Sequence, residues 1–264
     1  MYLLPETELI KITHTSDKDN SATFVIEPLS PGYGMTIGNS LRRVMLSSLE
    51  GSAVSSVKID GASHEFSALE SMREDIVQFI LNLKGLPLRL HGDEAATLVL
   101  DVKGPGNITA KDFKTNAQIE IIDPTYHLAT LEKGGKIRAE VTIEKGRGFV
   151  PTEKRTDEKV PLGTILIDSV FTPIKKVHYD VVNTRVGSVT NFDKLTIDIT
   201  TNGSITPEEA IKRACQILID HMTLVNEEIV IKTVTSKTKK AKSTGSTKAK
   251  PKITAKKVKK SAKN

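Results

Sequence analysis

The stretch PGYGMTIGNSLRRVML, residues 31–46, places three glycines ahead of a run with helical periodicity. Its apolar residues recur at spacings of three, four and eight, which gathers them on one face of a helix. The members of this stripe are Ile37, Leu41, Val44, Met45 and Leu49. Gly51 then supplies a stop signal. The spacing therefore predicts an amphipathic helix over about residues 36–49, entered through a glycine-rich turn.

The glycines of this stretch allow two interpretations. Gly32, Gly34 and Gly38 form G-x-G-x-x-x-G, one residue longer than the dinucleotide-binding fingerprint. A P-loop needs Lys followed by Ser or Thr after its last glycine, whereas Asn39 and Ser40 follow Gly38. The spacing thus favours a tight turn and close helix packing. The alternative is a nucleotide-binding enzyme, and it predicts nucleotide binding that is lost when Gly34 or Gly38 is changed.

Two further helices have recognisable beginnings. One starts at a capping box over Ser71–Glu74 and continues to Leu83 before Gly85 ends it. The other starts at a capping box over Thr206–Glu209, with Pro207 as its first helical residue. This last helix is expected to be about 30 Å long, at 1.5 Å per residue.

Alternation with period two marks strands elsewhere in the chain. The clearest case is Ile137, Ala139, Val141 and Ile143, with charged residues and Thr142 between them. Strands of this kind predominate from Gly51 to about residue 170, while each flanking segment supplies a long amphipathic helix and short strands. The distribution predicts an α+β fold with an inserted strand-rich domain.

Charge is divided unevenly along the chain. The sequence has 38 Lys and Arg against 32 Asp and Glu, for a net charge of +6. Residues 232–264 hold 13 lysines and no acidic residue, so residues 1–231 carry 25 basic and 32 acidic residues, a net charge of −7. The Lys-rich segment has few large apolar side chains, and we expect it to be a disordered tail. An electrostatic argument for binding nucleic acid applies to this tail alone.

Residues typical of catalytic and metal sites are sparse. Cys215 is the single cysteine and lies on an apolar helical stripe, and the six histidines have no metal-ligand spacing. No nucleophile elbow surrounds Ser40. We therefore expect no catalytic residue, metal or cofactor. Because neither a signal peptide nor a long apolar run is present, we also expect a soluble cytoplasmic protein without membrane contact.

Taken as a whole, the sequence resembles the N-terminal domain of the bacterial RNA polymerase α subunit family. The resemblance rests on long colinear blocks that cover nearly all of residues 1–230. These blocks are FVIEPLSPGYGMTIGNSLRRVMLSSLEGSAVSSVKIDGASHEFSALESMREDIVQFILNLKGL, GRGFVP at 146–151, LGTILIDSVFTPIKKVHYDV at 162–181 and DKLTIDITTNGSITPEEAIKRACQILIDHM at 193–222. Such a match is far more specific than any short motif.

The resemblance implies a domain organisation and a homodimer. Residues 1–50 and 175–231 would form a discontinuous dimerisation subdomain, residues 51–174 an inserted subdomain and residues 232–264 the tail. The helix after GYG and the long C-terminal helix would pack against their copies in a second chain. The residues expected in that dimer interface are Ile37, Leu41, Ile211, Leu218, Met222 and Val225. Packing within the chain's own core is the alternative for each of them.

The resemblance also implies the large subunits as partners. Arg43, the second arginine of LRR, would contact the β subunit, although a solvated helix face also explains such a pair. The residues expected at the β and β′ interfaces are Arg42, Arg43, Leu46, His64, Lys84, Ile167 and Ile174. The chain would be a non-catalytic scaffold: it dimerises, one copy takes β and the other β′, and these large subunits supply the metal-dependent nucleotidyl transfer.

The Lys-rich tail stands where the family continues into a helical, promoter-binding C-terminal domain. We expect that promoter contacts of that kind are missing here. The hypothesis for the tail is salt-sensitive, sequence-independent attraction to DNA. A solubilising extension without a partner is the alternative.

Overall fold

The computed structural model describes residues 10–18, 20–114, 116–155 and 161–241, and the chain divides into the units Met1–Leu218 and Ile219–Asn264. Two hydrophobic cores lie in the first unit. One is built from residues between Ala22 and Leu49 and between Ile174 and Ala214. The other is built from residues between Val54 and Ile167. The expected α+β fold with a strand-rich insertion is confirmed.

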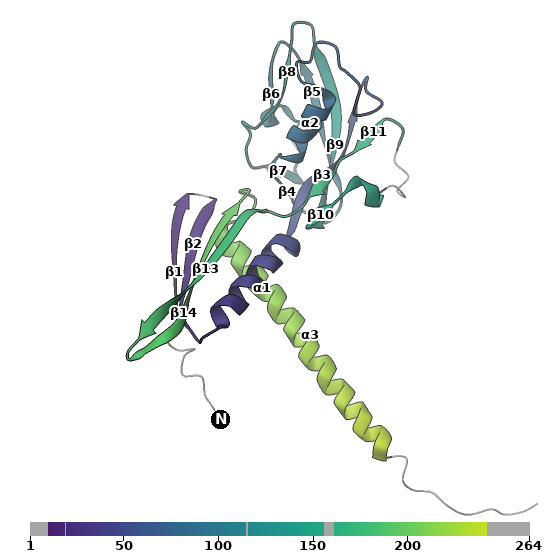
Figure 1. The fold of residues 1–264 in the computed structure, drawn as a ribbon. Coiled ribbons are helices and arrows are strands. Elements are labelled where there is room, and N and C mark those ends of the chain that lie inside the picture. Colours follow the sequence, from purple (N-terminus) through teal and green to yellow (C-terminus); the bar gives the residue numbers. More distant parts are fainter. Residues whose placement is uncertain (1–9, 19, 115, 156–160, 242–264) are drawn as a thin grey trace, which may run out of the picture. The chain divides into compact units, whose positions relative to one another are not determined.

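The discontinuous core is centred on an antiparallel sheet of strand order β1-β2-β14-β13. Its strands are β1 (Lys11–Lys18), β2 (Ser21–Leu29), β13 (Ile174–Val186) and β14 (Val189–Thr201). Helix α1 (Tyr33–Ser47) packs on β13 and β14 (Figure 1). The sheet thus joins segments that are about 150 residues apart in the sequence.

The glycines of α1 explain how closely the helix approaches the hairpin β13–β14. A Cβ added at Gly34 would lie 2.7 Å from Cγ1 of Val181, and one at Gly38 would lie 2.7 Å from Cδ2 of Tyr179. Both distances are too short for any side chain. Four residues apart, the two glycines lie on one helix face, which Leu41 continues. Close packing is therefore the role of Gly34 and Gly38.

The inserted core contains a second antiparallel sheet, of strand order β11-β3-β9-β5, and helix α2 (Ile76–Lys84). The sheet strands are β3 (Glu50–Ile59), β5 (Ala96–Lys103), β9 (Lys136–Arg147) and β11 (Thr164–Leu166). Three two-stranded sheets complete it: β4 (Leu88–Leu90) with β7 (Ile119–Ile121), β6 (Gly106–Thr109) with β8 (His127–Leu131), and β10 (Phe149–Val150) with β12 (Ser169–Val170). The 3-10 turns are η1 (Ala110–Asp112) and η2 (Thr152–Arg155). The alternation of β9 is confirmed, since Ile137, Ala139, Val141 and Ile143 are all buried.

The predicted start of α2 is wrong. Ser71 has φ +66° and its carbonyl accepts the N–H of Glu132, so it does not cap a helix. Glu74 turns away to Thr130: its carboxylate accepts the Thr130 N–H at 2.6 Å and the Thr130 hydroxyl at 3.0 Å. Ser71 and Glu74 have the spacing of a capping box, but the Glu74 carboxylate bonds Thr130, which is distant in the sequence. Helix α2 begins only at Ile76.

Helix α3 (Pro207–Ala241) begins as predicted and ends later than predicted. The Thr206 hydroxyl accepts the N–H of Glu209 at 3.3 Å, which confirms the N-cap. The Glu209 side chain bonds Arg213 instead of closing the box. With 35 residues the helix is about 50 Å long. The described helix extends through residue 241, ten residues into the segment expected to be disordered, and residues 242–264 lie outside the described part of the chain.

Candidate protein-interaction surface

The glycine-rich turn before α1 already holds a carboxylate. Oδ2 of Asp193 accepts the main-chain N–H of Gly32 at 2.9 Å and that of Gly34 at 3.0 Å. These N–H groups belong to the positive end of the helix, where a phosphate would bind. The donors that a nucleotide phosphate needs are therefore taken by the chain itself. This arrangement contradicts the alternative of a nucleotide-binding loop.

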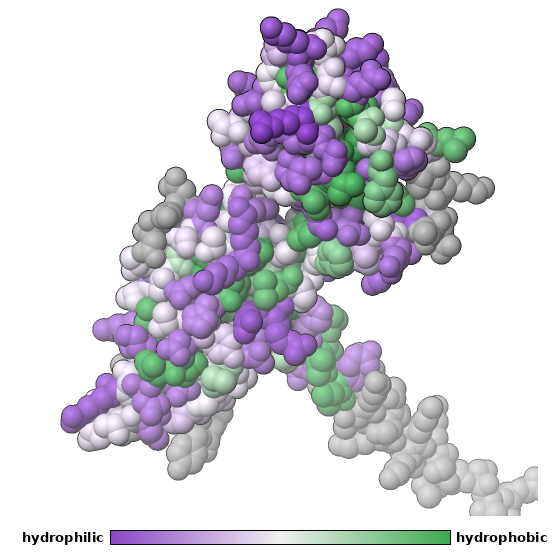
Figure 2. Space-filling model, turned by 45° about the horizontal axis from the view of Figure 1, so that its top comes forward, coloured by the Kyte–Doolittle hydropathy of each residue, from purple (hydrophilic) through white to green (hydrophobic). Residues whose placement is uncertain are grey.

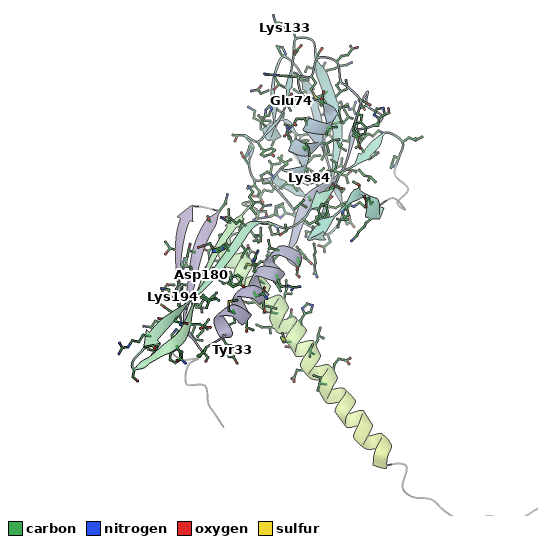
Figure 3. All side chains as sticks on the ribbon, in the orientation of Figure 1. Tyr33, Glu74, Lys84, Lys133, Asp180 and Lys194 are labelled. Atoms are coloured by element: carbon green, nitrogen blue, oxygen red, sulfur yellow. The ribbon has the colours of Figure 1, made fainter. Side chains whose placement is uncertain are left out.

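The outward face of α1 presents charge and apolar surface together. Met35, Arg42, Arg43 and Leu46 are exposed there, opposite the face that packs on the sheet. Neither guanidinium forms an ion pair with another residue of the described ranges. Tyr33 marks the beginning of this helix in Figure 3. An unpaired, planar guanidinium beside an exposed leucine is a pair of groups typical of interface anchors.

A second exposed surface runs along the inserted domain and is called here the insert ridge: Val77, Leu81, Lys84, Phe149 and Val170. Its first three members lie on one face of α2, at spacings of four and three. Nζ of Lys84 then lies 5.7 Å from the ring centroid of Phe149, which pairs with Val170 between β10 and β12. Leu81 is 53% exposed and Phe149 55% exposed. Hydrophobic residues reach the surface between hydrophilic ones in the face shown in Figure 2. The ridge thus combines exposed apolar side chains of α2, β10 and β12 with one cation, Lys84.

Asp168 holds the ridge in place. Its Oδ2 lies 3.4 Å from Nζ of Lys84, and its Oδ1 accepts the N–H of Thr152 at 2.9 Å. The hydrogen bond from the Thr152 N–H lowers the pKa of the Asp168 carboxyl most, and the nearby Lys84 lowers it further. Together they outweigh partial burial, which raises the pKa, so the pKa of Asp168 is lowered. One carboxylate thus fixes both the end of α2 and the start of η2 (Figure 3 labels Lys84).

Phe171, the residue after Val170 of the ridge, packs against the sheet of the inserted domain. A Cβ at Gly51 would collide with the carbonyl oxygen of Phe171, and one at Gly146 would lie 2.7 Å from its ring. The guanidinium carbon of Arg155 lies 5.9 Å from the centroid of the Phe171 ring. Arg155 is buried and pairs with Glu144 at 3.1 Å. Because Gly51 and Gly146 lack side chains, Phe171 can pack directly on the sheet. Its packing also positions Val170, the preceding residue.

The end of α1 lies next to the beginning of β10. A Cβ added at Gly148 would lie 3.3 Å from the carbonyl oxygen of Ser47, and Gly148 has φ +64°. Nε of Arg147 donates to Glu50 at 3.0 Å. The outward face of α1 and the insert ridge thus come from segments that touch at Ser47 and Gly148.

The structure separates the residues expected at the β and β′ interfaces. Arg42, Arg43, Leu46 and His64 are exposed, and Lys84 lies in the insert ridge. Ile167 and Ile174 are only 2% and 4% exposed and belong to the two cores. Direct contact between these two side chains and a partner is contradicted, because they are already packed inside the chain.

The residues expected in the dimer interface also fall into groups. Leu41 is buried in the chain's own core, and Ile37, Ile211 and Leu218 are half-buried against it. In the second unit, Met222, Val225 and Ile229 are exposed, Met222 at 67%. From Ile211 through Cys215 and Leu218 to Ile229 the spacing alternates between four and three, as in a coiled-coil seam. Met222 and Val225 are thus exposed members of this apolar stripe.

Sequence reasoning missed Asp193, Leu81, Phe149 and Val170. Phe149 had a signal, since an aromatic residue follows two glycines in GRGFVP. Asp193 had none, because its partners lie about 160 positions away.

Neither a metal site nor a membrane span is found in the described ranges. No three His, Cys, Asp or Glu side chains among those residues lie together as metal ligands. In the same ranges, no helix has the length and apolar character needed to cross a membrane.

Comparison with known proteins gives matches over most of the chain. The family model for the RNA polymerase Rpb3/RpoA insert domain matches residues 57–172. The chain is 52% identical to the DNA-directed RNA polymerase subunit alpha of Symbiobacterium thermophilum over 208 residues, 78% of this chain and 66% of the relative. It is 49% identical to the DNA-directed RNA polymerase subunit alpha of Alkaliphilus oremlandii, over 83% of this chain and 68% of the relative. It is 50% identical to that of Moorella thermoacetica, over 83% of this chain and 69% of the relative. The chain spans about two thirds of the length of these relatives.

Proposed function

Because the chain belongs to the family of bacterial DNA-directed RNA polymerase α subunits, we propose that it dimerises and holds the β and β′ subunits together for transcription. Its contribution is assembly, and the nucleotidyl transfer belongs to the large subunits. Assembly of the polymerase would take place in the bacterial cytoplasm, where the DNA template lies. The observation that carries the proposal is the unpaired Arg43 next to exposed Leu46 on the outward face of α1.

Dimerisation is supported by the exposed seam of α3. Met222 and Val225 are exposed and continue the alternating four- and three-residue spacing of Ile211, Cys215 and Leu218. Covering such a side chain with a partner gains about 1.5–3 kcal/mol relative to leaving it in water. A second copy of the same helix offers the same seam, so a two-fold pairing covers both at once.

Binding of a large subunit is supported by the chemistry of α1. The Arg43 guanidinium offers a planar set of N–H donors. Since no described residue pairs with it, a carboxylate or carbonyl oxygen of the partner can take those donors. Leu46, one turn further along, adds apolar area beside this polar contact. Such a combination gives both orientation and affinity.

The insert ridge extends this docking surface. Leu81 and Phe149 supply apolar area, and Lys84 supplies a cation whose direction Asp168 fixes. Ser47 and Gly148 connect the ridge to the end of α1. A single large subunit that covers both surfaces would hold the two subdomains together.

The same surface has to serve two different partners. In a dimer both copies carry identical α1 faces and insert ridges, whereas β and β′ are different chains. The two copies therefore become inequivalent only when the first large subunit binds. Such ordered assembly follows from symmetry and needs no second binding site.

The Lys-rich segment adds a proposal of its own, since its 13 lysines are unopposed by any acidic residue. Lysines that neutralise DNA phosphates release counterions, so their effect is strongest at low salt. Deleting residues 232–264 is expected to weaken DNA binding by the assembled polymerase and to flatten its salt dependence. Unchanged affinity at low salt would contradict a role in DNA binding.

The proposal is tested by capture of purified β subunit on the full-length chain. Arg43→Ala is expected to remain a dimer and to lose most of its capture of β. Arg73→Ala removes an exposed arginine of the inserted domain and is expected to capture β like wild type. Full capture by a folded Arg43→Ala dimer would overturn the assignment.

A further inference from the structure

Helix α1 has no N-terminal cap within its own sequence. Gly32 stands at the cap position and has no side chain, and the first turn contains no acidic residue. The first N–H groups of a helix need an acceptor, and a carboxylate is the strongest one available. Asp193 supplies it from β14, at 2.9 Å to Gly32 and 3.0 Å to Gly34. The cap is therefore a tertiary contact.

The position of Asp193 is itself well fixed. Its main chain pairs with Asn183 on one side and with Leu29 on the other, inside the sheet. The residue is only 7% exposed, and no cation among the described residues forms an ion pair with it. A Cβ at Gly34 would lie 3.0 Å from the Cβ of Asp193, so the helix start touches this strand directly. The two N–H groups of α1 thus meet an acceptor whose main chain is paired on both sides in the sheet.

A small tilt at this end of the helix has a large effect at the other. Arg43 lies nine residues beyond Gly34, about 14 Å along the axis, so a tilt of about 10° moves it by about 2 Å. That displacement exceeds the range over which a hydrogen bond keeps its strength. The direction in which α1 presents Arg43 and Leu46 therefore depends on how its N-terminus is held.

We infer that Asp193 is a positioning residue for partner docking: its carboxylate, bound by Gly32 and Gly34, fixes the direction in which α1 offers Arg43 to the large subunit. The inference rests on the proposed function, because it assumes that the outward face of α1 is the docking face. It adds a residue that lies outside that face and acts through the helix. Its effect comes from the negative charge at the helix start.

The test removes only the carboxylate and then returns it. Asp193→Ala leaves room for one formate ion next to the two N–H groups. We expect the full-length Asp193→Ala dimer to capture purified β subunit about tenfold more weakly, and sodium formate to restore capture relative to sodium chloride at equal ionic strength. Asp193→Asn keeps the shape without the charge, and we expect a loss of about threefold without any response to formate. Asp180→Ala, an exposed aspartate of the same hairpin labelled in Figure 3, is expected to match wild type in both salts.

The outcomes separate this inference from the proposed function. Wild-type capture by both Asp193 variants overturns the inference, and so does a loss by folded Asp193→Ala that formate does not reverse. If Asp193→Ala does not fold, Asp193→Asn decides: reduced capture with an unchanged dimer mass supports positioning, and unchanged capture overturns it. Arg43→Ala stands apart from these results. Should it retain capture of β, the proposed function fails whatever the Asp193 variants do.

Discussion

Lys84 and Asp168 form an ion pair in the inserted domain, with 3.4 Å between Nζ and Oδ2. The pair is partly exposed, so its contribution to the stability of the fold is small. Its effect is on direction, because the same Nζ lies 5.7 Å from the ring centroid of Phe149. Asp168 thereby holds a cation over an exposed aromatic ring, in the middle of the insert ridge.

Polar substitution in the insert ridge is expected to weaken docking without unfolding the chain. Leu81→Ser and Phe149→Ser each remove an exposed apolar side chain, so the urea midpoint should stay near that of wild type. Capture of the large subunit should fall about tenfold or more if these side chains are interface anchors. Ile12→Ser, at an exposed position of β1, is the matched control and should bind normally. Normal capture by both ridge variants would exclude the ridge from the interface.

Glu74 is expected to stabilise the fold in a pH-dependent manner. Burial raises the pKa of its carboxyl, but hydrogen bonds from the N–H and hydroxyl of Thr130 and from His127 outweigh burial, so the pKa is lowered from its ordinary value of 4.5. A carboxyl with a lowered pKa in the folded state stabilises above its unfolded pKa, and this stabilisation is lost as the pH falls through the folded pKa. We therefore expect Glu74→Gln to cost about 1–2 kcal/mol at pH 7.

Urea unfolding at several pH values checks this expectation. The difference in the free energy of unfolding between wild type and Glu74→Gln should shrink as the pH falls below 4.5. Glu70→Gln, an exposed glutamate shortly before it, should show no difference at any pH. A difference for Glu74→Gln that is constant with pH would mean that charge is not its cause.

Gly38 is expected to tolerate no side chain. An alanine normally stabilises a helix by about 1 kcal/mol relative to glycine. Here its Cβ would lie 2.7 Å from Tyr179 and 2.9 Å from Leu195, so the helix must move off the hairpin. We expect Gly38→Ala to lower the free energy of unfolding by about 1–3 kcal/mol. Asn39→Ala, on the exposed side of α1, should be neutral or stabilising, and equal stability of the two variants would refute the packing role.

The exposed seam of α3 is expected to decide the oligomeric state. Replacing Met222 and Val225 together by Asp places charges in the seam, and sedimentation should then show a monomer. Leu224→Asp is the control, because Leu224 is similarly exposed on α3 but lies outside the seam. A dimer that survives the double substitution would place the dimer interface elsewhere.

Local patterns in the sequence predicted the fold well. The alternation of Ile137 to Ile143 predicted a strand because one face of β9 is buried in a core. The spacing of Leu41 and Met45 predicted α1, and the entry of α1 lies three residues earlier than expected because the glycine turn is part of the helix. Both are properties of neighbouring residues, which the sequence displays directly.

Contacts between distant residues could not be predicted in this way. Ser71 and Glu74 have the spacing of a capping box, yet Glu74 bonds Thr130, which no local pattern indicates. Asp193 caps a helix from about 160 positions away. Ile167 was expected at a surface from resemblance, although its burial depends on the packing of the whole inserted domain. Of the residues in the proposed docking surface, the resemblance pointed to Arg43, Leu46 and Lys84, while the arrangement of Phe149 and Val170 required the fold.

The mass of the complex formed with purified β subunit is the sharpest check on docking through Arg43. Native mass spectrometry of the full-length chain mixed with β should give two copies of the chain bound to one β subunit. The same mixture with Arg43→Ala should give the dimer and free β as separate species. Assembly of the same three-chain complex by Arg43→Ala, or no complex with the wild-type chain, would rule out docking of β through Arg43.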